Sequence, residues 1–167
     1  MRKLFTILAA ILCLEAGAQN NAQDLIDILQ SSRVSIKYSY ADSHGNELGS
    51  GMATVQGRCY SVVESGTKFI CDSTTLWTVN TRSKEIYIED AGGKADIFGN
   101  LDKILEGVSN LQIDGTRISF TMIMKGVSEP LSCKATILRK TQKSEDLSDF
   151  RVDTSKYDKL WVITDLR

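Results

Sequence analysis

The strongest constraint on the fold of this chain is the repeated alternation of apolar and polar residues in short segments. The clearest case is VSIKYSYA at residues 34–41, where every second side chain is apolar or aromatic. A period of two places successive side chains on opposite faces of a β-strand. Turn residues separate it from further segments of this kind, which predict strands at residues 47–56, 58–64 and 67–71.

A β-hairpin is predicted over residues 71–89, read as CDSTTLWTVNTRSKEIYIE. Its turn is residues 80–83, and its return arm alternates glutamate with isoleucine. We expect Glu85 and Glu89 to lie on the outer, solvated face of this strand. Leu76 and Trp77 on the first arm are expected to be wall residues of a curled sheet.

Two segments carry the period of a helix instead, at residues 21–32 and 96–108. Strands are predicted to resume at residues 110–113, 117–125, 131–139 and 160–164, whereas the polar stretch KTQKSEDLSD before the last one indicates a loop. The chain is therefore predicted to be mainly β with α, an α+β protein with a large antiparallel sheet that amphipathic helices partly cover.

The first 18 residues have the three parts of a secretory signal peptide: a basic start, an apolar run and a small-residue site, Ala16-Gly17-Ala18. Cleavage is predicted between Ala18 and Gln19, which leaves one domain of residues 19–167. Cys13 supports a second interpretation, in which it is the acylated first residue of a lipoprotein. The bulky Leu12 before it argues against this interpretation.

Three cysteines remain after the signal: Cys59, Cys71 and Cys133. Cys59 and Cys71 flank a predicted turn on neighbouring strands, so a disulfide between them is one possibility. The other is that all three are buried thiols that act as small apolar residues.

Charge and residue types argue against several classes of function. Lysine and arginine number 20 against 21 aspartate and glutamate, so the chain has no net positive charge that would attract nucleic acid. His44 is the single histidine and lies in a predicted turn, so a Ser-His-Asp unit or a histidine-based metal site cannot be assembled within the chain. We therefore predict no enzymatic activity, no metal and no cofactor.

Apolar and aromatic side chains are more prominent than polar chemistry. They either form an ordinary packed core, or part of the surface they form lines a cavity for an apolar ligand. The candidates for such a cavity are Ile36, Tyr38, Tyr40, Tyr60, Phe69, Leu76, Trp77, Phe98, Leu101, Leu105, Phe120, Met122 and Met124.

Several motifs together resemble the periplasmic outer-membrane lipoprotein carrier family, LolA. They are Gly49-Ser50-Gly51 early in a strand, CDSTTLWTVN at residues 71–80, and EIYI at residues 85–88. The helix before the first strand and the close at residues 150–167 follow the order of that family, so the resemblance covers nearly the whole predicted mature chain.

The resemblance implies an incomplete antiparallel β-barrel, or half-barrel, with helices covering its open concave side. It further implies a monomeric periplasmic carrier that shields the acyl chains of lipoproteins. Its partners would be an inner-membrane lipoprotein-releasing transporter and an outer-membrane acceptor.

The chain departs from the family pattern after the second strand. An Arg-Pro step is usual there, and its arginine locks the lid helices; here Arg58 is the candidate for that arginine, and no proline follows it. Ser73 replaces a usual glycine. The same fold also serves acceptors and lipid-sensing modules, so a sensing or partner-binding module without a shuttle role is the alternative.

Overall fold

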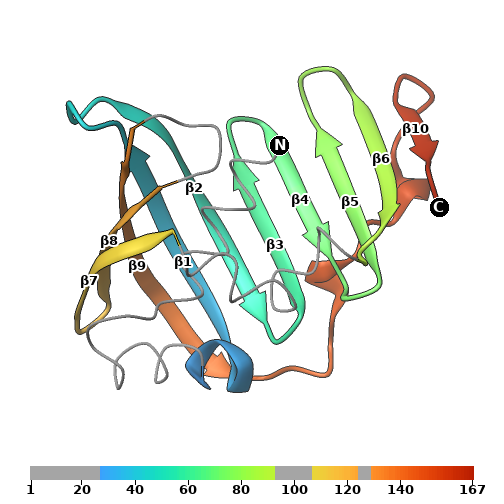
Figure 1. Ribbon diagram of the computed structural model, residues 1–167. Helices are drawn as coiled ribbons and strands as arrows, with labels where there is room; N and C mark the ends of the chain where they lie inside the picture. Colours follow the sequence, from blue (N-terminus) through green and yellow to red (C-terminus); the bar gives the residue numbers. More distant parts are fainter. Residues whose placement is uncertain (1–26, 93–106, 124–128) are drawn as a thin grey trace.

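A computed structural model describes residues 27–92, 107–123 and 129–167 of the chain. These residues form one open sheet of ten strands, in the order β10-β6-β5-β4-β3-β2-β1-β9-β8-β7 (Figure 1). The strands are β1 (Ser32–Ala41), β2 (Glu47–Gln56), β3 (Cys59–Glu64), β4 (Thr67–Cys71), β5 (Thr75–Asn80), β6 (Glu85–Asp90), β7 (Val108–Asp114), β8 (Arg117–Met122), β9 (Leu131–Gln142) and β10 (Val162–Asp165).

The predicted meander is confirmed from β1 to β6, because each of these strands pairs antiparallel with the next along the chain. The β3–β4 hairpin turns at Ser65-Gly66, where both residues have positive φ, of 49° and 85°. Two successive positive φ angles match the twist of the flanking strands, and glycine adopts the second without steric cost. β9 returns to the other side of β1, and β8 and β7 follow outward.

The last strand departs from the expected topology. β10 pairs with β6 in parallel, with Val162 opposite Glu85 and Asp165 opposite Ile88, so the sheet is not wholly antiparallel. A parallel neighbour requires a long crossover rather than a tight turn. The connection from β6 to β10 includes β7, β8 and β9, and its last part is the segment between β9 and β10, defined here as the C-terminal strap (residues 143–161), which contains the short 3-10 helices η3 (Ser148–Phe150) and η4 (Thr154–Lys156).

The predicted helices are only partly within the described residues. Residues 27–31 are helical, and β1 begins directly after them at Ser32, so the expected helix end at residue 32 is nearly right. Residues 96–106 of the second expected helix lie outside the described residues. Its last expected residue, Val108, is instead the first residue of β7.

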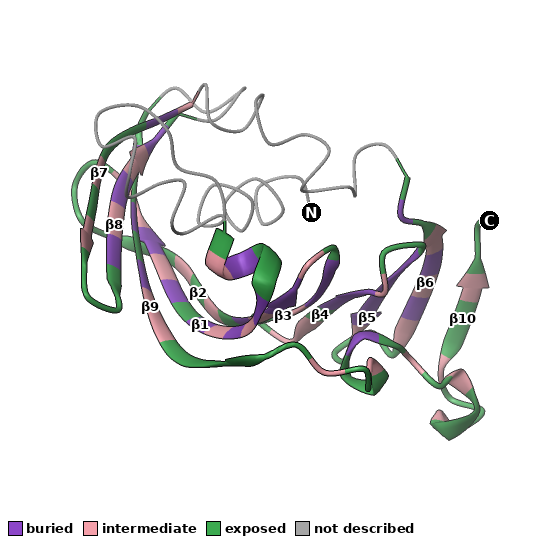
Figure 2. Cartoon of the chain, turned by 90° about the horizontal axis from the view of Figure 1, so that it is seen from below, coloured by how far each residue is buried: buried purple, intermediate pink, exposed green. Residues whose placement is uncertain are grey.

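The sheet is curved, and each of its two faces buries a separate core. Figure 2 shows the helix at residues 27–31 on the concave side and the strap on the convex side. The concave core draws on every strand except β6 and β10 and also includes Leu29. A smaller convex core, made by β4, β5 and β6, packs against the strap through Val152, Tyr157 and Trp161.

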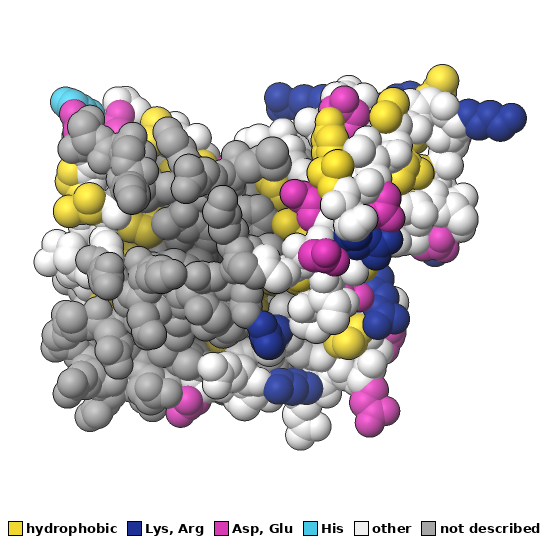
Figure 3. Space-filling model, turned by 45° about the vertical axis from the view of Figure 1, so that its right-hand side comes forward, with side chains coloured by type: hydrophobic (Ala, Val, Ile, Leu, Met, Phe, Trp, Pro, Cys, Tyr) yellow, Lys and Arg dark blue, Asp and Glu magenta, His cyan; other side chains and the backbone are white. Residues whose placement is uncertain are grey.

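The β10 edge of the sheet exposes apolar side chains. Leu160, Val162, Ile163 and Leu166 are each more than two-fifths exposed. Figure 3 shows hydrophobic side chains among charged ones at this end of the molecule. β10 spans only four residues, and a short edge strand limits pairing with other chains.

Candidate functional site

The concave face of the sheet is the candidate site, and its most ordered part is a pair of tyrosines stacked over two glycines. Tyr38 on β1 lies opposite Gly51 on β2, and Tyr40 lies opposite Gly49. A Cβ atom at Gly51 would lie 2.7 Å from the Tyr38 hydroxyl, and one at Gly49 would lie 2.5 Å from Cζ of Tyr40. The rings thus occupy the space above β2 that only glycine leaves open.

Both tyrosines reach across β2 to the same carboxylate on β3. The Tyr38 hydroxyl donates to Oε2 of Glu64 at 2.6 Å, and the Tyr40 hydroxyl donates to Oε1 at 2.8 Å. Burial, and then the hydrogen bonds to Glu64, raise the pKa of both phenols far above the ordinary value. The phenols therefore stay neutral and act as donors that hold three strands in register, with no role as acids or bases near neutral pH.

We call Tyr38, Tyr40 and Glu64 the tyrosine clamp. Around it, the concave face is apolar across eight strands. Its buried side chains come from β1 to β5 and from β7 to β9. The structure brings together eight of the residues predicted from the sequence: Ile36, Tyr38, Tyr40, Tyr60, Phe69, Leu76, Phe120 and Met122. Among the described residues, only Ile28, Leu29 and Ala91 add to this core from outside the strands. We call this surface the concave floor.

Trp77 does not belong to the concave floor, and its prediction as a wall residue beside Leu76 is wrong. It packs in the convex core with Ile86 and Ile88. Leu76 and Trp77 are adjacent in a strand, so their side chains point to opposite faces. Glu89 lies opposite Leu76 in the β5–β6 pair, so its side chain is on the concave side. The glutamates of β6 were expected on the outer face, so the two faces of β6 are the reverse of the prediction.

Several predicted residues are placed differently or lie elsewhere. Phe98, Leu101, Leu105 and Met124 lie outside the described residues. Arg58 is exposed in the turn between β2 and β3, and its predicted role in locking a lid stays a prediction.

Of the two possibilities for the cysteines, the structure shows the buried thiols and no disulfide between Cys59 and Cys71. Cys59, Cys71 and Cys133 are free thiols, and all three are buried. Cys71 lies opposite Tyr60, the residue after Cys59, so the two cysteine side chains are on opposite faces of the sheet. Burial raises the pKa of each thiol, to about 12 for Cys133. They act as small apolar residues, and the described residues include no cluster of three ligands for a metal.

The C-terminal strap is not visible as a distinct element in the sequence, whose polar stretch KTQKSEDLSD indicates a loop. Gln56 on β2 anchors its start, since its side-chain amide donates to the Ser144 carbonyl at 2.7 Å and its oxygen accepts from the Ser144 N–H at 3.0 Å. Arg33 on β1 lies 5.0 Å from the centre of the Phe150 ring and pairs with Asp149. The aromatic residues Phe150, Tyr157 and Trp161 in an otherwise polar segment were the signal that could have revealed it.

A second ion pair ties the strap to the start of the β4–β5 turn. Nε of Arg151 lies 3.3 Å from Oδ2 of Asp72. Burial alone would raise the pKa of Asp72, but hydrogen bonds from Thr75 and Thr74 and the Arg151 charge outweigh it, so the carboxyl pKa lies below its ordinary value. The strap is therefore attached to the sheet at three points by polar contacts.

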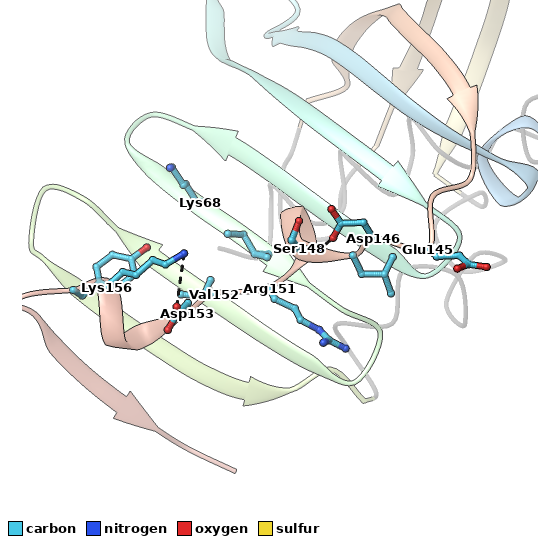
Figure 4. A pocket seen from close by; sticks show the side chains of 11 residues that line it. Lys68, Glu145, Asp146, Ser148, Arg151, Val152, Asp153 and Lys156 are labelled. Carbon is cyan, nitrogen blue, oxygen red and sulfur yellow. Dashed lines mark hydrogen bonds and ion pairs between the residues drawn. The ribbon is translucent and has the colours of Figure 1, made fainter.

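Between the strap and β4 lies a groove of about 690 Å³ on the convex side. Figure 4 shows Lys68, Arg151 and Lys156 around it, with Lys156 paired to Asp153. The lining mixes both signs of charge, so the groove has no uniform electrostatic preference for a ligand.

Comparisons with known proteins assign no family to the chain. No protein-family model matches it, and no curated protein matches it. A solved structure of an uncharacterized conserved protein from Thermus thermophilus is similar, with a TM-score of 0.48 and 6% sequence identity, over 89% of this chain and 99% of that one. Among the described residues, no helix is both long and apolar enough to cross a bilayer.

Proposed function

We propose that this protein is a periplasmic carrier that shields the acyl chains of lipoproteins between the inner and the outer membrane. The observation that carries the proposal is the concave floor, an apolar surface that extends over eight neighbouring strands of a curved sheet. A long apolar ligand needs such an extended surface, whereas a compact substrate needs a small pocket with converging polar groups.

The free energy of transfer from water favours binding of an acyl chain on the concave floor. Each methylene group removed from water is stabilised by about 0.8 kcal/mol, so an acyl chain in transit needs a protein surface to cover it. The Tyr38–Glu64 and Tyr40–Glu64 hydrogen bonds satisfy the polar atoms at this part of the floor. Met122 adds an adaptable apolar side chain at its β8 end.

The proposal includes the finer features that the family resemblance implies. The chain would be exported by cleavage of residues 1–18, helices would cover the open side of a half-barrel, and the partners would be a lipoprotein-releasing transporter and an outer-membrane acceptor. No enzymatic step is involved. The motif at residues 71–80 and the glycines that admit Tyr38 and Tyr40 support this assignment.

The test is binding of a fluorescent triacylated lipopeptide to the purified protein, with stoichiometry measured by native mass spectrometry. We expect a one-to-one complex. Phe120→Ala on the concave floor should weaken binding, whereas Trp77→Ala in the convex core should leave it unchanged after folding of both variants is checked by circular dichroism. Absence of binding, or equal loss in the two variants, would contradict the proposal.

A cellular experiment separates a carrier from a sensing module. Depletion of a carrier should strand lipoproteins at the inner membrane, which fractionation of the two membranes detects. Normal sorting after depletion, together with lipopeptide binding in vitro, would favour the sensing module.

A further inference from the structure

The convex face of β8, β9, β1, β2, β3 and β4 has an unusual distribution of charge. Strand alternation assigns to this face the side chains that point away from the concave floor. Within these six described strands, one paired residue on this face is acidic: Glu47, which lies opposite Ala41 at the end of the face and accepts a hydrogen bond from Ser50. The others are Arg117, Ser119, Thr121, Ser132, Lys134, Thr136, Arg139, Thr141, Arg33, Ser35, Lys37, Ser39, Ala41, Ser50, Met52, Thr54, Gln56, Cys59, Ser61, Val63, Lys68 and Ile70.

One row across this face combines cations with exposed apolar side chains. Cross-strand pairing aligns Lys37 with Met52, Met52 with Val63, and Val63 with Lys68. Met52 is 51% exposed and Val63 is 41% exposed, and both lysines are exposed. On the other side of Lys37, the row continues through Thr136 to Arg117. We call Arg117, Lys134, Lys37, Met52, Val63 and Lys68 the convex basic patch.

Two other acidic residues of the sheet lie on the concave side. Glu64 points to the concave side, and Glu89 shares the face of Leu76. The strap brings further acidic residues to the convex side: Asp149 pairs with Arg33 at the Ser32 end of β1, and Glu145, Asp146 and Asp153 line the groove that Lys68 also lines. Arg117, Lys134, Lys37 and Lys68 form no ion pair with another described residue. Arg117, Lys134 and Lys37 therefore make the β8–β9–β1 part of this face basic, although the net charge of the chain is −1.

We propose that the convex basic patch docks the protein on an anionic lipid bilayer. Each basic side chain near a bilayer surface adds attraction to anionic headgroups, and lysine and arginine stems extend their charges while apolar neighbours contact the interface. The alternation of Lys37, Met52, Val63 and Lys68 along one row supplies both contacts side by side.

A protein partner of acidic character fits the patch less well. Stable protein interfaces concentrate their energy in aromatic anchors and arginine, and no paired residue on this face of the six described strands is aromatic. Attraction through separated lysines instead gives weak, reversible, salt-dependent binding. The docking proposal does not depend on whether the concave floor holds acyl chains.

The experiment is co-sedimentation of the purified protein with vesicles of phosphatidylcholine alone and with phosphatidylglycerol added, at low and high salt. Binding should require phosphatidylglycerol and weaken with salt. The triple variant Lys37→Gln, Lys68→Gln, Lys134→Gln should bind about a hundredfold more weakly, since each charge contributes roughly fivefold. Met52→Ser should weaken binding a few fold without changing its salt dependence.

The matched control removes the same number of charges at exposed positions outside the patch: Lys84→Gln, Lys140→Gln, Lys159→Gln. This control should bind anionic vesicles as the unchanged protein does. Equal binding to both vesicle types, equal loss in the two triple variants, or capture of an acidic protein without any vesicle binding would overturn the proposal.

Discussion

The ring of Tyr38 lies across the backbone of Gly51, its cross-strand partner, in space that any larger residue would fill. The aromatic ring covers the glycine and in doing so reaches Glu64 on the next strand. Glycine is usually unfavourable inside a strand, so this contact gives a physical reason for its presence here.

Gly51→Ala should destabilise the fold by about 1–3 kcal/mol, the usual cost of overpacking a buried site. The added methyl group would lie 2.7 Å from the Tyr38 hydroxyl and even closer to the Val63 carbonyl oxygen, which belongs to the backbone and cannot move aside. Urea unfolding measures the change. Gly92→Ala is the control, because a Cβ there meets nothing within 4 Å; equal effects would contradict the account.

Replacing Tyr38 and Tyr40 by phenylalanine, singly and together, should show strong coupling. Each hydroxyl donates to a different oxygen of Glu64, and hydrogen bonds to charged groups contribute about 1.5–3 kcal/mol. The loss of unfolding free energy in the double variant should differ from the sum of the losses in the two single variants, because the two donors share one carboxylate. A double-mutant cycle from urea unfolding measures this, and strict additivity would show that the donors act independently.

Stability should fall as the pH rises above about 10, the ordinary pKa of tyrosine. In the folded protein, burial and the Glu64 hydrogen bonds raise the pKa of Tyr38 and Tyr40, so these phenols keep their protons when the unfolded chain loses them. The folded state then binds more protons, and its stability decreases with pH. Urea unfolding at a series of alkaline pH values should give a shallower decrease for Tyr38→Phe than for the unchanged protein.

The thiols of Cys59, Cys71 and Cys133 should react with Ellman's reagent only after unfolding. All three are buried, and burial raises their pKa values, so the reactive thiolate is rare in the folded state. A reductant should leave the thermal unfolding temperature unchanged. A lower temperature in reductant would indicate a disulfide and contradict the structure.

Phe150→Ala should destabilise the protein by about 3–5 kcal/mol, the cost of removing a fully buried phenylalanine. Phe150 has no exposed surface, and Arg33 lies over its ring. Leu160→Ala, at a strap residue that is 68% exposed, should change stability little. Similar unfolding free energies for both variants would show that the strap does not stabilise the sheet.

Much of the sheet was predictable because its strands alternate with a period of two. β2 and β4 have the predicted bounds, and the tight turns between hairpins follow from local residues such as Gly66. Which face of a strand meets which core was not predictable in the same way. Along β6 the alternation is clear, yet only the pairing with β5 shows that Ile86 and Ile88 face the strap and that Glu89 faces the concave side.

The strap was missed for a related reason. Its residues carry no period, because it is held by separate anchors such as the Gln56–Ser144 pair and the Phe150 side chain rather than by a regular ladder. The tyrosine clamp was predictable only in part. The sequence pattern indicated both tyrosines and the two glycines, but the role of Glu64 depends on the strand register across β1, β2 and β3. Contacts of this kind arise from tertiary pairing and not from local pattern.

The parallel pairing of β10 with β6 also bears on how the chain reaches its folded state. The hairpins from β1 to β6 close over short loops, whereas β10 must return over the whole crossover before Val162 meets Glu85. Local contacts form before distant ones because closing a long loop costs more entropy. Until the strap arrives, Trp77, Ile86 and Ile88 present an uncovered apolar surface, so association between incompletely folded chains should begin on the convex face of β5 and β6.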